Sequence, residues 1–335
     1  MGNTESTLGN MVDNFWKDRP VFVTGASGMV GSCLTHGLLE HGAFIVVLIR
    51  DIDPQSELFR SGDISHVHSV NGSLEDGTSV ERALVEYDID TVFHLGAQTQ
   101  VISANSVPLL TFEANIRGTY LLLNACCRHS NRVRRVLIAS SDKVYGQHPS
   151  LPYTEETPLC GHYPYDVSKS CVDLLSQSYF HTYNLPVAIA RCGNIFGPGD
   201  LNWNRLVPGT IRSLYRNERP IVRSNGLYMR DYFYVEDAVS AYMMLAEQLE
   251  SKQLAGEVFN FSNENPLTVL DMIDQIQFAM GFSITPIIRD EATGEIINQY
   301  LSAEKAKKQL GWRYTYNLTG ALTETVSWYK GFLHD

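Results

Sequence analysis

A glycine-rich turn between an apolar strand and a helix restricts most strongly what this chain can fold into. Residues 24–31, with the sequence Thr-Gly-Ala-Ser-Gly-Met-Val-Gly, close the apolar run 21–25 and open a helical pattern. Gly25 permits a tight turn, Gly28 lets a diphosphate approach the backbone, and Gly31 lets the helix pack on the strand. The free N–H groups and the dipole of the helix N-terminus favour phosphate at the same point. Three glycines can form a simple turn, but in this context they predict a dinucleotide site made by Gly25, Ser27, Gly28, Met29, Val30 and Gly31.

Strand-like and helix-like patterns alternate after this turn. The apolar runs that we expect to form strands are 44–50, 91–96, 135–141 and 187–191. Helical patterns lie between them at 32–41, 80–85 and 112–127. Such alternation is typical of βαβ units and a parallel sheet. We therefore predict an α/β fold, a Rossmann-type doubly wound parallel sheet with a smaller C-terminal substrate-binding lobe.

The sequence also predicts how the chain is divided. Residues 1–18 precede the first strand, and we expect them to form a solvated extension. The dinucleotide-binding domain is expected over 19–190, with a returning segment near 232–262. Beyond residue 191 irregular segments with Pro and Gly are mixed with helices, so 191–335 is expected to be mainly the substrate-binding lobe.

Charge and hydropathy exclude two classes of partner. The net charge of −11 argues against nucleic acid as the main partner, because binding of phosphate polymers is driven by basic surface. No apolar run reaches the roughly 18 residues that a membrane span requires. The N-terminus has no basic region followed by an apolar stretch, so we expect no secretory signal and a cytoplasmic location.

The cysteines give no sign of a metal site. They form neither a CxxC motif nor a cluster with histidine, and several lie in apolar segments. We expect reduced core thiols and no metal. The six residues are Cys33, Cys126, Cys127, Cys160, Cys171 and Cys192.

The end of the second strand bears on the type of dinucleotide. An acidic residue there would hydrogen-bond the ribose hydroxyls of NAD, whereas an arginine would hold the 2′-phosphate of NADP. Arg50 and Asp51 both stand at this point. We favour NAD, and Arg50 leaves NADP open.

A tyrosine and a lysine are spaced for hydride chemistry. Tyr165 and Lys169 lie four residues apart, so they share one face of a helix. A tyrosine with a pKa of about 10 must lose roughly 3 units, ~4 kcal/mol, to act as a base near neutrality. The lysine ammonium and a cationic nicotinamide would both favour the phenolate. A surface pair is the alternative, but the dinucleotide loop upstream favours a catalytic one.

An acid and an amine stand side by side at the end of an apolar strand. The segment Ser-Ser-Asp-Lys-Val-Tyr-Gly, residues 140–146, contains Ser141, Asp142 and Lys143. Consecutive strand residues point to opposite faces, so the chain must leave strand geometry at Ser141 for both groups to reach one substrate. Simple oxidation or epimerisation needs no such pair. An exposed ion pair at the strand end is the structural alternative.

Several motifs together resemble a known family. The glycine loop, the segment FHLGAQ of residues 93–98, the YxxxK motif and RDYFYVEDAV of residues 230–239 are similar to those of the extended short-chain dehydrogenase/reductases that act on nucleotide sugars. The likeness runs from about residue 19 to residue 312. Within that superfamily, SSDKVYG and the segment 191–212 look most like CDP-glucose 4,6-dehydratase.

The resemblance implies a reaction and a role for each catalytic candidate. Tyr165 would take the proton of the sugar 4-hydroxyl while hydride leaves C4, and Ser141 would hold the 4-oxygen. One member of the Asp142–Lys143 pair would then remove the C5 proton and the other would protonate the leaving 6-hydroxyl. By analogy Lys143 is the base and Asp142 the acid, although the sequence leaves this assignment open. Lys143 must be neutral for that role, so its pKa must fall by several units.

The resemblance also implies binding residues. Cofactor contacts are expected from the glycine loop and from Arg50, Asp51, Leu95, Ala97, Tyr165 and Lys169. Contacts to the nucleotide sugar are expected from Asn194, Arg205, Leu206, Val207 and Arg230.

Two other functions stay open at this point. A 4-epimerase would need Tyr165 and the cofactor but no working Asp142–Lys143 pair. A catalytically silent dinucleotide-binding regulator would need no phenolate at all. The resemblance also implies that the helical stretches 112–127 and 166–183 pair with a second copy, so a homodimer or homotetramer is expected. Neither the nucleobase nor the hexose can be read from the sequence.

Overall fold

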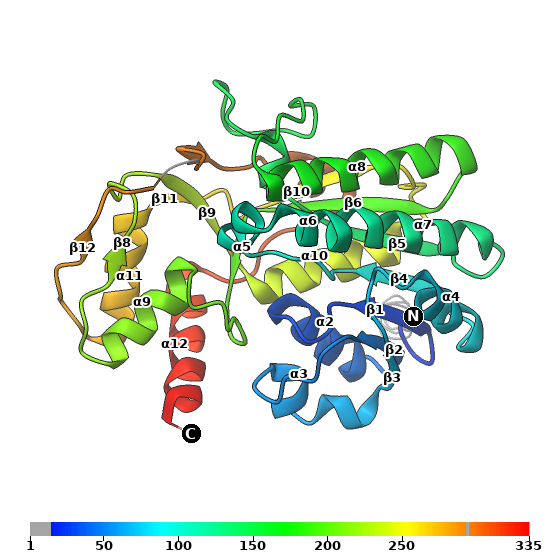
Figure 1. Ribbon diagram of the computed structural model, residues 1–335, viewed down its shortest axis with the longest axis horizontal. Coiled ribbons are helices and arrows are strands. Elements are labelled where there is room, and N and C mark those ends of the chain that lie inside the picture. The colour runs from blue at the N-terminus through cyan, green and yellow to red at the C-terminus, as the bar shows by residue number, and fades with distance from the viewer. Residues whose placement is uncertain (1–14, 293–294, 335) are drawn as a thin grey trace, which may run out of the picture.

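A seven-stranded parallel sheet forms the centre of the larger lobe in the computed structural model, which describes residues 15–292 and 295–334 (Figure 1). Its strand order is β10-β6-β5-β4-β1-β2-β3. The strands are β1 (Pro20–Thr24), β2 (Phe44–Ile49), β3 (His68–Asn71), β4 (Thr91–His94), β5 (Arg135–Ser141), β6 (Val187–Cys192) and β10 (Val258–Phe261). The order reverses between β1 and β4, which places a crevice at the carboxyl ends of these two strands. The predicted doubly wound α/β fold is confirmed.

All five predicted strands form within two residues of their expected ends. β3 was not predicted, because it is short and three of its four residues are at the surface, so no apolar run marks it. β10 joins the edge of the sheet beside β6, from the segment near 232–262 that we expected to return.

Helices cover both faces of the sheet. α2 (Met29–Glu40) and α10 (Val235–Gln248) cover one face. The other face is covered by α4 (Gly77–Glu86), α7 (Gly118–Arg128) and α8 (Pro164–Tyr183). Successive side chains of a strand point to opposite faces of the sheet, so each strand contributes to the cores on both faces. In β5, Leu137 packs under α2 and α10, and Val136 packs on the other face.

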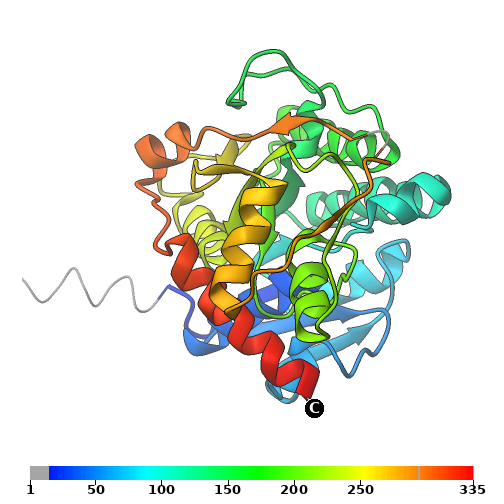
Figure 2. The same ribbon diagram turned by 90° about the vertical axis from the view of Figure 1, so that its left-hand side faces the viewer.

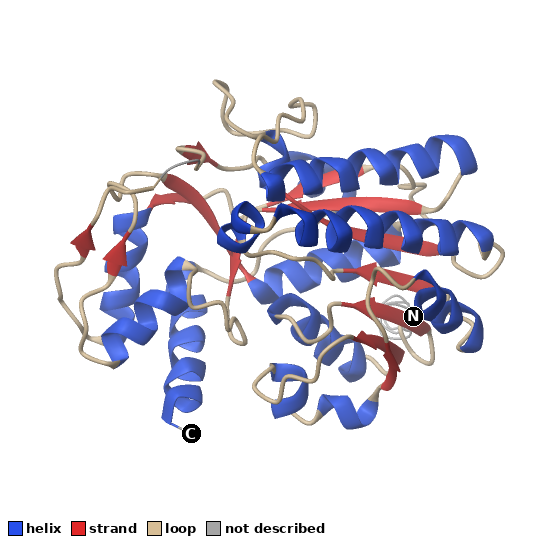
Figure 3. Ribbon diagram, viewed as in Figure 1, coloured by secondary structure: helices blue, strands red, loops and turns tan. Residues whose placement is uncertain are grey.

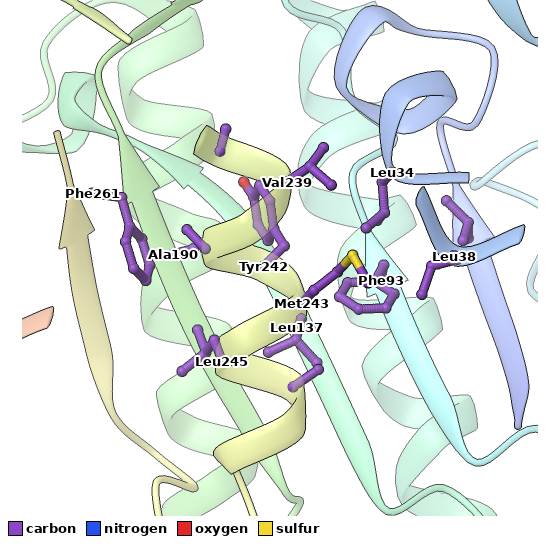
Figure 4. Packing of buried hydrophobic residues seen from close by; sticks show 14 of the residues in the cluster. Leu34, Leu38, Phe93, Leu137, Ala190, Val239, Tyr242, Met243, Leu245 and Phe261 are labelled. Carbon is purple, nitrogen blue, oxygen red and sulfur yellow. The ribbon is translucent and has the colours of Figure 1, made fainter. Parts of the chain in front are cut away.

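The first of these layers shows how the helices bury their apolar faces (Figure 4). Leu34 and Leu38 of α2 stand opposite Met243 of α10, and Phe93 of β4 lies between them and the sheet. Tyr242 lies over Ala190 of β6. This packing fixes α2, and with it the loop that precedes α2, against β1 and β4.

Short elements complete the larger lobe. They are α3 (Glu57–Arg60), the 3-10 helices η1 (Asp63–His66) and η3 (Asp142–Tyr145), α5 (Val101–Ser106), α6 (Pro108–Phe112) and the π-helical turn η2 (Glu113–Arg117). α6, η2 and α7 follow one another directly, so the helical pattern predicted at 112–127 is the middle of a longer helical segment.

The smaller lobe is built from later parts of the chain (Figures 2 and 3). Its main sheet has the order β11-β9-β13, and β7 pairs with β9. Three helices pack on one another beside it around a separate apolar core. The elements are β7 (Asn194–Phe196), α9 (Leu206–Tyr215), β8 (Ile221–Val222), β9 (Met229–Tyr234), β11 (Pro266–Thr268), α11 (Val269–Met280), β12 (Ile287–Ile288), β13 (Asn298–Gln299) and α12 (Leu318–His334). The π-helical turn η4 (Ala306–Leu310) comes between β13 and α12 but packs on α10 and β10 of the larger lobe.

The predicted solvated extension is wrong in its last part. Trp16 is buried in the core against Phe93, and its indole N–H donates a 2.6 Å hydrogen bond to Oε1 of Glu247. The large apolar ring is more stable packed against α10 than in water. The rest of the predicted extension, residues 1–14, lies outside the described residues.

Two further observations concern the described residues as a whole. No helix among them is long and apolar enough to cross a membrane. No group of three or more metal-ligating side chains is found in residues 15–292 and 295–334. The six cysteines all lie in this part of the chain and are free thiols.

Candidate active site

The glycine loop lies at the carboxyl end of β1, where the strand order reverses. Gly25 has a φ of +74°, and a Cβ there would stand 2.7 Å from Cα of Gly96. A Cβ on Gly31 would overlap the carbonyl oxygen of Gly25 and stand 2.7 Å from its carbonyl carbon. No side chain caps the N-terminus of α2, and Gly28 at its start is exposed. The N–H of Gly28 donates to the carbonyl of Gly25 at 3.0 Å, so a diphosphate in this open cradle would meet the N–H groups of the first turn of α2.

A recess of ≈ 420 Å³ adjoins the ends of the strands next to this cradle. It is lined by Arg50, Glu75, Ala97, Gln98, Thr99, Gln100, Leu110 and Ala114. Two predicted cofactor residues, Arg50 and Ala97, thus lie in its wall. Arg50 is paired with Asp51 through a 2.6 Å contact from Nε to Oδ2. The two residues that competed for the ribose therefore share one location at the end of β2.

Buried hydrogen bonds fix the segment that follows β4. The backbone N–H of Leu95 donates to the carbonyl of Thr24 at 3.2 Å, which joins the ends of β4 and β1. Asn115 in η2 holds both backbone groups of Gln98, and its amide also donates to Oγ of Ser168 in α8 at 2.9 Å. This network ties the recess to the helix that carries Tyr165.

The chain leaves strand geometry directly after Ser141, as the sequence required. The hydroxyl of Ser141 accepts from the backbone N–H of Lys143 at 3.3 Å and donates to Oδ1 of Asp142 at 3.0 Å. The 3-10 turn η3 that follows has about three residues per turn, so the strict alternation of a strand no longer separates Asp142 from Lys143.

Burial acts on the two members of this pair in opposite directions. Asp142 is 2% exposed, and its Oδ2 is buried without a hydrogen-bond partner in the part of the chain that the structure describes. Burial raises the pKa of Asp142, although the amine of Lys143 pulls that pKa down. Burial lowers the pKa of Lys143, and the charge of Arg230 lowers it further. Both shifts favour the neutral forms, an acid that can donate a proton and an amine that can accept one.

Tyr165 and Lys169 lie buried on the same side of α8. Burial raises the pKa of Tyr165 to about 12, while Arg205 and a hydrogen bond with Ser141 act to lower it. Nζ of Lys169 donates to the carbonyl oxygen of Ala139 in β5 at 2.7 Å, and burial lowers the pKa of this amine to about 8. The side chains around Tyr165 thus do not produce the lowered pKa expected for it, because removal from water, together with the charges of Asp142 and Asp166, outweighs the effect of Arg205 and Ser141.

Two buried carboxyl groups near this centre were not predicted. Asp166 follows Tyr165 in sequence, and burial raises its pKa to about 6, opposed by the charge of Lys143. Asp231 is completely buried, and burial raises its pKa to about 7. Asp166 lies within the YxxxK motif and Asp231 within the motif of residues 230–239. Neither motif indicates that these carboxyl groups lie near the Asp142–Lys143 pair, because that proximity arises only in the tertiary structure.

The predicted substrate residues lie where the smaller lobe meets the sheet. Asn194 begins β7, and its buried amide nitrogen has no hydrogen-bond partner. Arg205 precedes α9 and donates to Oδ2 of Asp200 at 3.2 Å and to Oγ1 of Thr99 at 3.4 Å. Leu206 and Val207 form the first turn of α9 beside it. The charge of Arg205 lowers the pKa of Tyr165, so the structure brings these two predicted residues close together.

Arg230 is brought to the Asp142–Lys143 pair but is already occupied. Its guanidinium donates to the carbonyl oxygens of Met229, Ile297 and Ile296 at 2.8, 2.8 and 2.6 Å. It also lies 3.7 Å from Oε2 of Glu295. In this state the arginine holds the segment before β13, and its contact with a diphosphate stays a prediction.

The protein is similar to known nucleotide-sugar enzymes along nearly its whole length. The family model described as the NAD dependent epimerase/dehydratase family matches residues 21–261. The CDP-glucose 4,6-dehydratase of Salmonella typhimurium is 30% identical, over 96% of this chain and 94% of that protein. The dTDP-glucose 4,6-dehydratase of Streptomyces antibioticus is 29% identical, over 92% of each.

Solved structures share the fold. The dTDP-glucose 4,6-dehydratase of Bacillus anthracis in complex with NAD superposes with a TM-score of 0.82 at 26% identity, over 93% of this chain and 97% of that one. The UDP-glucose 4-epimerase of Thermotoga maritima with UDP-glucose gives a TM-score of 0.85 at 24% identity, over 94% and 99%. Dehydratases and epimerases thus share this architecture, so the fold alone does not distinguish them.

Proposed function

The chain belongs to the NAD dependent epimerase/dehydratase family, and on this premise we propose that it is a nucleotide-sugar 4,6-dehydratase. Its reaction converts a nucleoside diphosphate hexose, with CDP-glucose favoured, to the 4-keto-6-deoxy sugar. It is a lyase that releases water and returns its cofactor unchanged.

One observation carries this proposal. Asp142 and Lys143 lie together on η3, and burial moves the pKa of each toward its neutral form. The charge of Asp142 also raises the pKa of Tyr165, so these three groups lie close enough to act together. Oxidation and epimerisation at C4 need a single base, whereas elimination of water needs a further base and a further acid. The pair supplies both.

Tyr165 opens the reaction at C4 of the sugar. Its phenolic oxygen takes the proton of the 4-hydroxyl, and the hydroxyl of Ser141 holds the same sugar oxygen against it. When bound, NAD accepts the hydride that leaves C4 and later returns it to C6. Because burial holds the pKa of Tyr165 at about 12, its loss of a proton depends on nearby positive charge, of which Arg205 supplies a part.

Lys143 and Asp142 then remove water from the 4-keto sugar. The ketone makes the C5 proton acidic, and the neutral amine of Lys143 takes it. Asp142 gives its proton to the 6-hydroxyl, which leaves as water and creates a C5–C6 double bond. Addition of hydride at C6 and return of the proton to C5 complete a 4-keto-6-deoxy sugar. The sugar loses one water and the cofactor is restored. The proton that Tyr165 gained from the 4-hydroxyl matches the one that Asp142 gave up, so exchange of one proton between them returns the enzyme to its starting state.

The residues present fit the dinucleotide. The glycine cradle has no room for a Cβ at Gly25 or Gly31, so the backbone there stays close to β4 and the first turn of α2 would meet the diphosphate with its N–H groups. Ser27, Met29 and Val30 complete the loop. Arg50 and Asp51 would meet the adenosine ribose, Leu95 and Ala97 would lie along the strand end, and Lys169 would meet the nicotinamide ribose. NAD is the cofactor of the family, and the pairing of Arg50 with Asp51 leaves this arginine partly neutralised toward a 2′-phosphate.

The nucleotide sugar would lie between the sheet and the smaller lobe. The unpartnered amide of Asn194 and the guanidinium of Arg205 would bind the diphosphate, with Leu206 and Val207 beside it. Arg230 would join them by giving up its carbonyl partners.

We also propose that two or more copies assemble. Apolar side chains stand exposed along α5 to α8, which is unusual for a surface that faces only water. They are Ile102, Val107, Leu109, Leu110, Tyr120 and Leu174. A homodimer or homotetramer that pairs these helices would cover them. A cytoplasmic location agrees with the six free thiols.

The proposal is tested by incubating the purified protein with CDP-, UDP-, GDP- and dTDP-linked hexoses without added reductant. Mass spectrometry is expected to show loss of one water from one of them, with the alkaline absorbance of a 4-keto sugar. The substrate that loses water also identifies the nucleobase that the enzyme accepts. An unchanged mass with altered sugar stereochemistry would make the protein a 4-epimerase, and bound dinucleotide without turnover of any sugar would make it a silent regulator.

A further inference from the structure

Gln299 reaches the candidate active site from the far end of the chain. It belongs to β13, which pairs in parallel with β9 so that Gln299 stands beside Arg230. The side chain is completely buried. Its Oε1 accepts a hydrogen bond from Nζ of Lys143 at 3.2 Å, across 156 positions of sequence.

The backbone around Gln299 is held on both sides. Before it, Arg230 donates to the carbonyl oxygens of Ile296 and Ile297. After it, the N–H of Leu301 donates to Oδ2 of Asp231 at 2.7 Å, and the N–H of Ser302 donates to the carbonyl of Tyr153 at 2.8 Å. A side chain on a segment clamped at both ends holds its partner within a narrow range of positions.

The amide suits an amine that must be neutral. A carboxylate in the same place would attract the ammonium form and raise the pKa of Lys143. An amide oxygen accepts the same hydrogen bond but carries no net charge. Gln299 therefore orients the amine and leaves its pKa to burial and to Arg230.

The other end of the amide lies near the acid. Nε2 of Gln299 is buried and has no hydrogen-bond partner among the described residues, and the same is true of Oδ2 of Asp142. The amide lowers the pKa of Asp142, so it lies close enough to stabilise the carboxylate. A buried donor and a buried acceptor without partners each cost free energy, and the hydrogen-bond effect of Gln299 on the pKa of Asp142 indicates that these two atoms face each other.

We propose that Gln299 is a positioning residue for elimination: its oxygen fixes the amine of Lys143 toward the C5 proton, and its amide N–H receives the carboxylate of Asp142 after proton transfer. This inference rests on the proposed dehydratase reaction and assigns a step to a residue outside the recognised motifs. If Gln299 had only a structural role, replacing it would slow oxidation and elimination alike. As a positioning residue, its replacement would slow only the elimination step, in which Lys143 and Asp142 act.

Four further groups act on Lys143 and would remain in any variant of Gln299. They are Asp142 on its own turn, Asp166 from α8, Arg230 from β9 and Glu295 before β13. Asp142, Asp166 and Glu295 raise the pKa of the amine, and Arg230 lowers it. A new carboxylate at position 299 would add to the first set, so it would move the pKa of Lys143 upward.

The test separates oxidation from elimination in the full-length protein loaded with NAD. Gln299→Leu removes both hydrogen-bonding ends at similar volume, and Gln299→Glu adds a charge. Asn298→Ala is the matched control, because neighbouring strand residues point to opposite faces. Three signals are followed with the nucleotide sugar that the wild type dehydrates: absorbance of the reduced nicotinamide, uptake of deuterium at C5 from heavy water, and loss of water by mass.

Gln299→Leu is expected to form the reduced nicotinamide at the wild-type rate but to slow deuterium uptake and loss of water, on the order of 10²-fold for a misplaced base. Gln299→Glu is expected to move the acidic limb of the pH–rate profile to higher pH, and Asn298→Ala to match the wild type. Equal slowing of all three signals in Gln299→Leu, or an unshifted profile in Gln299→Glu with a wild-type melting temperature, would overturn the inference. If the wild type removes water from no sugar, the proposed function fails first and the inference fails with it.

Discussion

The carboxyl group of Asp142 and the amine of Lys143, on consecutive residues of η3, have pKa values displaced in opposite directions by the same burial. In water these two groups would ionise and pair. Here burial shifts both groups toward their neutral forms, the forms in which the acid can donate a proton and the amine can accept one. The predictions below start from this relationship.

Replacing the amine should stop the reaction after its first step. Lys143→Met keeps most of the side-chain volume but removes the base, so loss of water is expected to fall by about 10²- to 10⁴-fold. Oxidation at C4 should persist, and the absorbance of reduced nicotinamide should build up and remain. Asp142→Asn should behave alike, since an amide cannot protonate the leaving hydroxyl. Normal dehydration in both variants would exclude the pair from catalysis.

Removing the phenol should stop the reaction before its first step. Tyr165→Phe leaves the buried ring in place but removes the base for the 4-hydroxyl, so formation of reduced nicotinamide is expected to fall by about 10²- to 10⁴-fold. Tyr163→Phe, two residues earlier at the start of α8, is the control and should react normally. Rapid formation of reduced nicotinamide in Tyr165→Phe would contradict this role.

The glycine cradle should tolerate no side chain at Gly31. A methyl group there would collide with the backbone of Gly25, so Gly31→Ala should displace the loop and reduce the dinucleotide that remains bound after purification. Gly37→Ala on the same helix meets only side-chain atoms at 3.7 Å and should be neutral or stabilising, by roughly 0.5–1 kcal/mol. Bound dinucleotide is measured by its absorbance after denaturation. Equal retention in both variants would show that the cradle is not the binding site.

Asp231 should make the protein less stable as the pH rises. Its pKa is raised to about 7 in the folded chain, so the folded state binds this proton more tightly than the unfolded state. The stabilisation is therefore fully present below about pH 4 and is lost as the pH rises through about 7. Asp231→Asn keeps an oxygen for the N–H of Leu301 and does not titrate, so the free energy of unfolding should shift in favour of the variant between about pH 5 and pH 8, on the order of 2 kcal/mol.

Urea unfolding of the wild type and of Asp231→Asn at about pH 5 and about pH 8 measures how the difference in their free energies of unfolding changes with pH. Asp142 and Glu264, which also raise the pKa of Asp231, are common to both proteins. A stability difference that is the same at both pH values would mean that Asp231 does not titrate in this range.

A charge on the apolar surface of α8 should break the proposed assembly. Leu174 is 58% exposed, and Leu174→Glu would bury a carboxylate if this surface meets a second copy. We expect a lower mass by sedimentation or light scattering. Phe278→Glu is the control, because Phe278 is 78% exposed on α11 of the other lobe. A wild-type protein that sediments as a monomer would refute the assembly itself.

Local patterns in the sequence were enough for most of the fold and for naming candidate site residues that the structure brings close together. The alternation of apolar runs and helical patterns predicted the parallel sheet, because a strand buried on both faces needs a continuous apolar run. The glycine loop marked the cradle, because only glycine fits where the backbones of Gly25 and Gly31 meet. The end of β5 required a turn at Ser141, and η3 begins there.

Only the tertiary structure decided how these groups are charged and what holds them. The sequence expected Tyr165 to have a lowered pKa, but the pKa depends on removal from water, which no local pattern records. The burial of Trp16 depends on the presence of Glu247 and Phe93 beside it. Gln299 stands in a segment without a recognised motif, and it meets Lys143, 156 positions earlier in the sequence, because β13 pairs with β9. Periodicity and turn chemistry are local, so the sequence by itself determined the helices, the strands and the candidate side chains. Contacts between distant segments depend on how the elements pack, so only the tertiary structure decided the burial and the hydrogen-bond partners of those side chains.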